Sequence, residues 1–224
     1  MSGALVAVVG MVREARTIAA DGVVTLVNGG DAAKLARELD EALYQGAVRV
    51  ISFGLCGGLD PTMKVGDVAV ATSVVAEGRR WDTDPAWTER LAGALPGARQ
   101  GPVTGSAAIV ATAEQKNGLR LASGALTCDL ESHVVARVAS NHGAPFAVVR
   151  AVSDAAQTSL PKAALVGLGA NGRPDIGRVL QSVLADPRQL PALIRLALDT
   201  EAAFDALEDA AAHCRDGHGW GNSG

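Results

Sequence analysis

The sequence predicts an α/β protein with a single domain. It has 224 residues, of which 48% are hydrophobic, so one core can bury most of its apolar surface. Only 3% of the residues are aromatic, which means that Ala, Val and Leu must form that core. Short apolar runs also alternate with segments of helical periodicity. These features are typical of helices packed on a buried sheet, and they argue against an all-β architecture.

Three strands and two helices are expected in the first part of the chain. The uninterrupted apolar run Leu5–Val9 indicates a strand buried on both faces, and two further strands are predicted at Val23–Val27 and Val48–Phe53. Gly10 turns the chain from the first strand into a helical segment that reaches Ala20. Asp31 is a good N-cap for a helix over residues 32–45, which Gly46 ends.

A glycine-rich segment, Gly54-Leu55-Cys56-Gly57-Gly58-Leu59-Asp60-Pro61, follows the third strand. Its glycine content predicts a loop, after which the chain resumes as a strand at Val68–Ala71. The carboxyl end of a strand is where open α/β sheets bind ligands. We therefore expect a binding site beside this segment.

The next elements bring three acidic residues to strand ends. The pattern predicts a surface helix at Asp84–Leu95, short strands near Val103 and Ile109, a helix at Ala113–Ser123, a strand at Ala125–Cys128, a helix at Ser132–Asn141 and a strand at Phe146–Val152. Asp129 and Glu131 lie at a strand-to-helix junction, and Ser153-Asp154 ends the last strand. These residues and the glycine segment should share one edge of the sheet.

The C-terminal third begins with a loop over residues 155–174 that is rich in Gly and Pro and is suited to be a lid over an apolar ligand. Two helices are expected between Ile176 and Ala212, interrupted at Asp186-Pro187. The polar, glycine-rich tail at residues 213–224 is predicted to be disordered. The domain should therefore comprise residues 1–212.

Composition bears on the partners and the location of the protein. The net charge is −4 and the basic residues are scattered, which argues against nucleic acid. The three cysteines have no metal-like spacing and suit a reducing compartment. No apolar run reaches the roughly 20 residues of a membrane span, and no signal segment is recognisable, so a cytoplasmic location is expected.

Four sequence blocks occur in an order found in one known family. They are Val9-Gly10-Met11-Val12-Arg13-Glu14, Ser52-Phe53-Gly54-Leu55-Cys56-Gly57-Gly58-Leu59, Asp129-Leu130-Glu131-Ser132 and Val149-Arg150-Ala151-Val152-Ser153-Asp154-Ala155. The chain resembles the superfamily of nucleoside phosphorylases and methylthioadenosine/S-adenosylhomocysteine nucleosidases. The resemblance implies a central mixed, partly barrel-like sheet flanked by helices, and cleavage of the N-glycosidic bond of a purine nucleoside.

By this resemblance, Asp154 is the acid that protonates the purine at N7, and Ser153 helps to orient it. Glu131 accepts hydrogen bonds from the ribose hydroxyls, with Leu130 beside it in the substrate site and Asp129 as a supporting neighbour. Glu14 orients or deprotonates an attacking water. Such chemistry needs one protonated and other ionised carboxyl groups, which local burial can provide.

The same resemblance places four residues of the glycine segment, Gly54, Leu55, Cys56 and Gly57, at the substrate, where their backbone N–H groups face the nucleophile. Arg80 is a further candidate for substrate binding. No cofactor and no metal are implied, because His133 near Asp129 has no complete ligand set and no Gly-x-Gly-x-x-Gly follows the first strand.

Two other classes of function stay open at this stage. One is a protein of the same fold that binds a nucleoside without turnover. The other is an α/β hydrolase with Cys56 as its nucleophile, suggested by the pattern Gly-x-Cys-x-Gly. Pro61 and a further strand follow that pattern in place of the helix that a nucleophile elbow requires. The hydrolase hypothesis is therefore the weaker one.

The nucleophile can be water or phosphate. Relatives that use phosphate typically carry an arginine shortly before the glycine turn, where this chain has Ser52. Arg13, Arg16 or Arg80 could substitute for it, because phosphate needs charge-assisted donors. The missing arginine therefore argues against phosphate as a co-substrate but does not exclude it.

Three further segments resemble the hopanoid-associated phosphorylase branch. They are Arg79-Arg80-Trp81 with Asp84 and Trp87, the run Leu160-Pro161-Lys162-Ala163-Ala164-Leu165-Val166-Gly167, and Asp186-Pro187-Arg188-Gln189-Leu190-Pro191. This likeness implies adenosylhopane, a hydrophobic membrane-associated substrate, with release of adenine. The alternative is that they are lid and surface helices of an ordinary nucleosidase. Phe53 or Trp81 could stack the base, and we expect a homo-oligomer.

Overall fold

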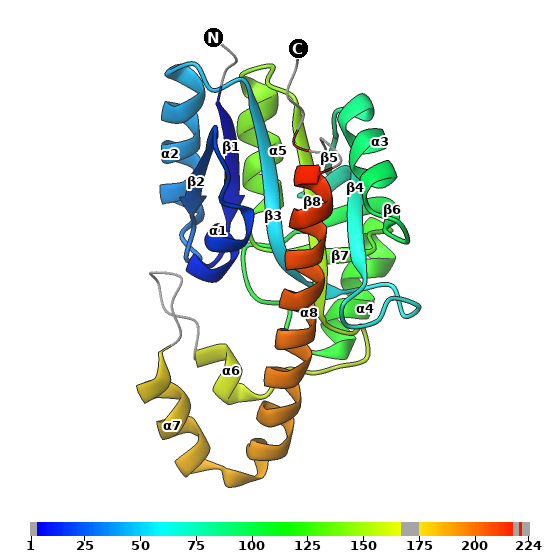
Figure 1. Cartoon of the computed structure of the whole chain (residues 1–224). Helices are drawn as coiled ribbons and strands as arrows, with labels where there is room; N and C mark the ends of the chain where they lie inside the picture. The colour runs from blue at the N-terminus through cyan, green and yellow to red at the C-terminus, as the bar shows by residue number, and fades with distance from the viewer. Residues whose placement is uncertain (1–3, 167–174, 217–219, 221–224) are drawn as a thin grey trace.

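The computed structural model describes residues 4–166, 175–216 and 220. It is a single α/β domain in which helices flank a mixed sheet (Figure 1). Its strands are β1 Leu5–Val9, β2 Val23–Val27, β3 Arg49–Gly58, β4 Val68–Ala76, β5 Arg79–Asp82, β6 Arg99–Gly105, β7 Thr127–Asp129 and β8 Phe146–Asp154. Its helices are α1 Val12–Ile18, α2 Ala32–Tyr44, α3 Pro85–Ala94, α4 Ala113–Ser123, α5 Ser132–Asn141, α6 Lys162–Val166, α7 Ile176–Ala185 and α8 Leu190–Asp216, with a 3₁₀ turn, η1, at Pro187–Gln189.

Part of the sheet closes on itself, which confirms the predicted mixed, partly barrel-like architecture. The strand order is β2-β1-β3-β7-β6-β4-β5, and β8 pairs with both β3 and β4. The strands β3, β7, β6, β4 and β8 therefore form a ring, to which β1 and β2 add an open wing. The pairs β1–β3 and β3–β8 are parallel, whereas β3–β7 and β4–β8 are antiparallel.

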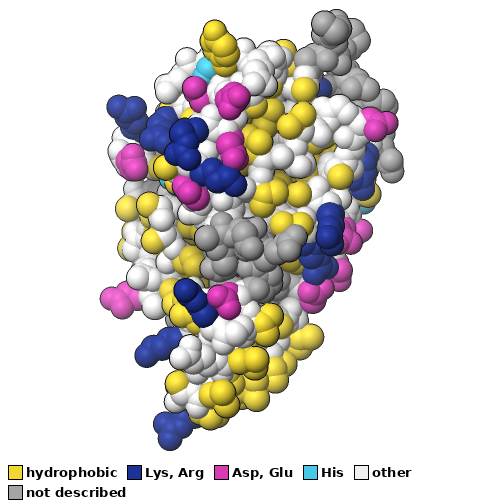
Figure 2. Space-filling model, turned by 90° about the vertical axis from the view of Figure 1, so that its left-hand side faces the viewer, with side chains coloured by type: hydrophobic (Ala, Val, Ile, Leu, Met, Phe, Trp, Pro, Cys, Tyr) yellow, Lys and Arg dark blue, Asp and Glu magenta, His cyan; other side chains and the backbone are white. Residues whose placement is uncertain are grey.

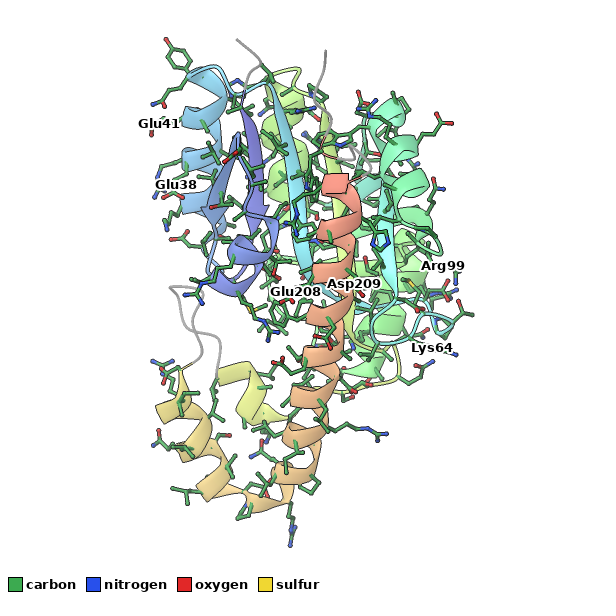
Figure 3. The ribbon with its side chains drawn as sticks, viewed as in Figure 1. Glu38, Glu41, Lys64, Arg99, Glu208 and Asp209 are labelled. Carbon is green, nitrogen blue, oxygen red and sulfur yellow. The ribbon has the colours of Figure 1, made fainter. Side chains whose placement is uncertain are left out.

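Two apolar layers cover the sheet. On one side Phe53 packs with Leu207 and Trp220, and on the other Leu35 and Leu39 of α2 pack toward α5. The predicted helix face of α2 is confirmed, because Leu35, Leu39 and Leu43 are its buried residues. Its charged residues Glu38 and Glu41 point away from the sheet (Figure 3).

The glycine segment differs from its prediction. Residues 54–58 continue β3, so the loop expected there is wrong up to Gly58. The reason is close packing inside the barrel, where a Cβ on Gly57 would lie 3.3 Å from the Cys128 sulfur and one on Gly58 would lie 3.2 Å from a Val152 methyl. Glycine serves here to bring neighbouring strands together and not to reverse the chain.

Other predictions need smaller corrections. The strand near Ile109 is absent, and this residue lies in irregular backbone, whereas β5 was not anticipated. The tail was predicted to be disordered from residue 213, but α8 continues to Asp216 and the Trp220 side chain is buried. The interruption at Asp186-Pro187 is confirmed by η1. The predicted lid contains α6, and its residues 167–174 lie outside the described part of the chain.

Outside the sheet and its flanking helices, part of the chain forms a second region. In Figure 1, α6, α7 and the first half of α8 extend below the sheet as a separate projection, which we call the lobe (residues 162–166 and 175–200). The carboxyl ends of β1, β3 and β8 point toward it. The barrel end and the lobe thus face each other across the region where ligands are expected to bind.

Candidate active site

A cavity of about 290 Å³ lies between the barrel end and the lobe. Its polar wall includes Glu14, Glu131, Ser153 and Asp154, which come from three separate stretches of the chain. Its remaining predicted members are Leu55, Cys56, Gly57 and Leu130. The predicted meeting of distant acidic residues at one place is therefore observed. We expected these residues to meet because they follow strands that end at the same edge of the sheet. This explanation is wrong for Asp129 and Glu131, because β7, which leads to them, runs antiparallel to β3.

Glu14 is held by backbone donors at the start of α1. Its Oε2 accepts hydrogen bonds from the N–H groups of Gly10 (2.7 Å) and Met11 (2.8 Å), and Oε1 accepts one from Leu55 (2.7 Å). Burial, together with the charge of Glu131, raises the pKa of Glu14 to about 7. The carboxyl group is therefore fixed in orientation and can change its protonation state near neutral pH.

Gly54 does not line the cavity, but it makes room for Glu14. Its φ is +155°, and a Cβ there would lie 2.5 Å from Glu14 Oε1 and 2.9 Å from Arg150 Nη1. Any side chain at this position would displace both groups. The role that the sequence implied for Gly54, direct presentation of its N–H to the substrate, is thus replaced by a steric one.

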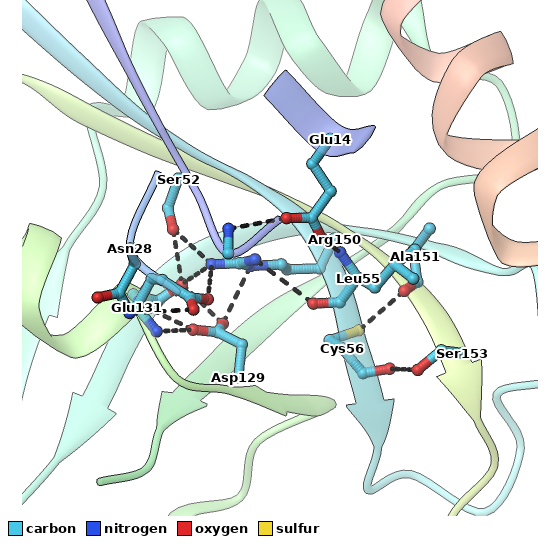
Figure 4. Close-up of polar contacts among 12 residues, drawn as sticks. Glu14, Asn28, Ser52, Leu55, Cys56, Asp129, Glu131, Arg150, Ala151 and Ser153 are labelled. Atoms are coloured by element: carbon cyan, nitrogen blue, oxygen red, sulfur yellow. Dashed lines mark hydrogen bonds and ion pairs between the residues drawn. The ribbon is translucent and has the colours of Figure 1, made fainter. Parts of the chain in front are cut away.

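Arg150 lies among the carboxylates of Glu14, Asp129 and Glu131 (Figure 4). It is fully buried in β8, with Nε 3.1 Å from Asp129 Oδ2 and Nη2 3.3 Å from Glu131 Oε2. Nη2 also donates to the Ser52 hydroxyl at 2.6 Å. Arg150 belongs to the sequence block Val149–Ala155, from which no role was predicted for it. The available signal was a charged residue in the middle of an otherwise apolar strand, which must have a buried partner.

Asp129 and Asn28 hold Glu131 in place. Asp129 Oδ1 accepts from the backbone N–H groups of Glu131 (2.9 Å) and Ser132 (2.7 Å), which fixes the start of α5. Asn28 Nδ2 donates to Glu131 Oε1 at 3.3 Å, a contact that the sequence did not suggest. Burial raises the pKa of Glu131, against the attraction of the Arg150 charge.

Asp154 lies at the end of β8 between two donors. The Ser153 hydroxyl donates to Asp154 Oδ2 at 2.8 Å, and the ammonium group of Lys116 donates to Oδ1. Lys116 is completely buried and also donates to the carbonyls of Ala155 (2.8 Å) and Thr158 (3.0 Å). Sequence reasoning missed Lys116, because a single lysine in an amphipathic helix is normally solvated.

Several predicted residues have other surroundings. Arg80 is exposed on β5, where Nε lies 2.9 Å from Asp82 Oδ1, and it does not line the cavity. Arg13 pairs with Glu201 at 2.7 Å and lies over the Phe204 ring, so it is directed away from the cavity as well. Phe53 and Trp81 pack in the core layers, so neither is placed to stack a base. Ile109 and Val110, by contrast, line the cavity.

The Cys56 hydrolase hypothesis is not supported by the geometry. Burial raises the pKa of the Cys56 thiol well above its ordinary value, and its sulfur contacts the Ala151 carbonyl at 3.4 Å. A nucleophilic cysteine needs a lowered pKa and an adjacent base. Among the described residues no group of His, Cys, Asp and Glu is arranged to hold a metal ion. None of the described helices is long and apolar enough to span a bilayer.

The fold and this carboxylate-lined cavity define a class of enzymes that act on nucleosides. The family model described as "Phosphorylase superfamily" matches residues 7–185, and the chain therefore belongs to that superfamily. A comparison with curated proteins found no significant match.

Similar solved structures come from nucleosidases. The 5′-methylthioadenosine/S-adenosylhomocysteine nucleosidase of Neisseria meningitidis, with methylthio-immucillin-A, is 21% identical, with a TM-score of 0.62 over 92% of this chain and 97% of the other. The Helicobacter pylori nucleosidase of the same name is 13% identical, with a TM-score of 0.68 over 96% and 97%. Futalosine hydrolase of Helicobacter pylori is 15% identical, with a TM-score of 0.63 over 82% and 98%. These likenesses establish the fold.

Proposed function

We propose that the protein cleaves the N-glycosidic bond of a purine nucleoside and releases the free base. The observation that carries this proposal is that Glu14, Glu131 and Asp154 line the same cavity. Cleavage of this bond builds positive charge on the ribose and negative charge on the base. One carboxyl group must then protonate the base, another must bind the sugar hydroxyls, and a third must direct the nucleophile.

Each acid has contacts that suit one of these roles. Asp154 lines the cavity and is the candidate for the group that delivers a proton to N7. The Ser153 hydroxyl and the Lys116 ammonium donate to its two oxygens, so the delivered proton must come from one of these donors or from solvent. Glu131 is buried and oriented by Asn28 and Arg150, which fits an acceptor for the 2′- and 3′-hydroxyls. Glu14 is held by three N–H groups and has a pKa of about 7, which fits a group that accepts a proton from water.

We propose water as the nucleophile. Among the described residues that line the cavity none is a lysine or arginine, and Glu14 occupies its nucleophile side. A phosphate dianion would have to be desolvated next to a buried carboxylate without charge-assisted donors, which is costly. Arg150 cannot replace them, because its guanidinium already contacts Asp129, Glu131 and Ser52.

For the substrate we propose an adenine nucleoside with an apolar 5′ substituent. Adenosylhopane is the candidate, because the lid and surface segments of the chain resemble those of the hopanoid-associated phosphorylase branch. Support comes from the wall opposite the acids, where Leu160, Ala164 and Leu196 line the cavity. This wall belongs to the lid and the lobe. It offers hydrocarbon to the part of the nucleoside that takes no part in the reaction.

The test is product analysis by mass spectrometry with adenosine, inosine and 5′-alkyl adenosines, each with and without phosphate. We expect free adenine and the free sugar in both conditions. A sugar 1-phosphate that appears only with phosphate would overturn water as the nucleophile and keep the bond cleavage. Tight binding without release of base would instead indicate a nucleoside-binding protein.

A further inference from the structure

The lobe carries two rows of exposed aliphatic side chains, one on α7 and one on α8. Ile176, Leu180 and Leu184 recur every four residues along α7, and Leu190, Ile194 and Leu198 do the same at the start of α8. A spacing of four places each set on one side of its helix. Their exposed fractions range from 46% for Leu190 to 82% for Leu184. We call these six residues the lobe face.

The lobe face is unusual within this molecule. Outside the lobe the exposed large hydrophobic side chains of the described residues are scattered, namely Val24, Tyr44, Val48 and Leu121. Figure 2 shows hydrophobic side chains gathered at the lower end of the molecule, where α7 lies. Single exposed hydrophobic residues are ordinary, whereas a contiguous apolar area marks an interaction site.

The charge of the lobe is opposite to that of the whole protein. The lobe as defined has four Lys and Arg residues and three Asp residues, whereas the complete chain has a net charge of −4. Lys162, Arg178, Arg188 and Arg195 are exposed. A basic rim around an aliphatic surface is the pattern of helices that lie in the interface of an anionic membrane.

We propose that the lobe face docks on the surface of an anionic lipid bilayer. The Leu and Ile side chains enter the acyl boundary, and the basic residues contact the lipid phosphates. Of these four basic residues only Arg178 forms an ion pair within the described part of the chain, with Asp175, so Lys162, Arg188 and Arg195 are available to lipid phosphates. Leu196 and Thr200 of α8 and Ala164 of α6 line the cavity, so the docked lobe would join the bilayer surface to the site. That this route serves an apolar nucleoside rests on the proposed function.

The experiment is sedimentation of the full chain with vesicles of phosphatidylcholine alone or with added phosphatidylglycerol, without nucleoside. We expect binding to the anionic vesicles that weakens at high salt, because screening reduces the contribution of each basic residue. Replacing Arg188 and Arg195 by Gln should lower the partition coefficient about fivefold for each residue. Arg37→Gln on α2 is the matched control and should leave binding unchanged.

The apolar contribution is tested with Leu180→Gln and Leu184→Gln. Each should lower the partition coefficient about tenfold, whereas Leu121→Gln on α4, a residue that is also exposed, should not. Circular dichroism and size-exclusion chromatography check fold and mass. Absence of vesicle binding by the unaltered chain, or a change of oligomeric mass in the Leu184 variant, would overturn the proposal, the latter in favour of a subunit interface.

These outcomes are separable from those of the proposed function. If adenosine is cleaved but vesicles are not bound, membrane docking fails and the enzymatic proposal stands. If vesicles are bound but no nucleoside releases its base, the reverse holds. The binding measurement contains no substrate, so neither result depends on the other.

Discussion

Charged side chains are usually exposed and large aliphatic side chains are usually buried. The barrel end departs from the first rule and the lobe from the second. At the barrel end, Glu14, Glu131, Asp154 and Arg150 are buried, and each contacts polar side chains or backbone groups. In the lobe, by contrast, residues such as Leu184 and Leu198 are exposed. The first arrangement costs stability and suits chemistry, whereas the second suits contact with another apolar surface. By the two proposals above, the first region performs the reaction and the second contacts the bilayer.

Asp154→Asn should have the largest effect, because it removes the proton that the departing base needs. We expect release of adenine to fall by at least about 10³-fold. Hydrolysis of 4-nitrophenyl riboside, whose leaving group needs no proton, should fall far less. Asp82→Asn on β5 serves as the control. Equal losses on both substrates would show that Asp154 acts in some other way.

Glu131→Gln should lower kcat/KM for ribonucleosides by about 10²-fold, since its interaction with the sugar hydroxyls strengthens as charge develops on the ribose. Nucleosides without the 2′- and 3′-hydroxyls should be almost insensitive to the substitution. Steady-state kinetics on both substrate types measure this difference. A similar loss on both would argue against a role in binding the diol.

The pH dependence tests Glu14. As a base, Glu14 must be ionised, so kcat/KM should rise about tenfold per pH unit below 7 and level off above it. The effect on stability has the opposite sign. Because burial raises the pKa of Glu14 to about 7, its contribution to stability is present at low pH and is lost as pH rises through about 7. Glu14→Gln should remove the activity slope.

Lys116→Met tests the buried partner of Asp154. Loss of the ammonium leaves the carboxylate with only the Ser153 hydroxyl, a change that typically costs about 3–5 kcal/mol in a buried pair. We expect a Tm lower by about 10 °C and activity reduced about tenfold, with a shifted pH profile. Lys116→Arg should recover part of both. An unchanged pH profile would restrict Lys116 to a structural role.

The lobe should give the smallest effect on the chemistry. Leu180→Gln and Leu184→Gln lie outside the cavity lining and should leave kcat/KM for adenosine within about twofold. The same variants should lose activity on apolar nucleosides presented in anionic vesicles. Assays with both substrate forms check this. A large loss on adenosine would mean that the two regions are not separate.

Much of the fold was predictable from local patterns. The apolar runs identified β1, β2 and most of β8, and Asp31 and Gly46 flank a helix that the structure contains. The candidate acids were predictable as well, because Glu14, Glu131 and Asp154 lie in recognisable motifs at the ends of strands. Less predictable were the groups that hold them, since Asn28, Lys116 and Arg150 are separated from their partners by 19 to 103 residues.

The sequence by itself determined the α/β class, the periodic faces of the helices and the acids available for chemistry, because these depend on neighbouring residues along the chain. Only the tertiary structure decided that the glycine segment is a strand, that Arg80 lies away from the cavity and that Lys116 pairs with Asp154. Those outcomes follow from barrel closure, which brings distant backbone and charges within contact distance. No local pattern contains that information.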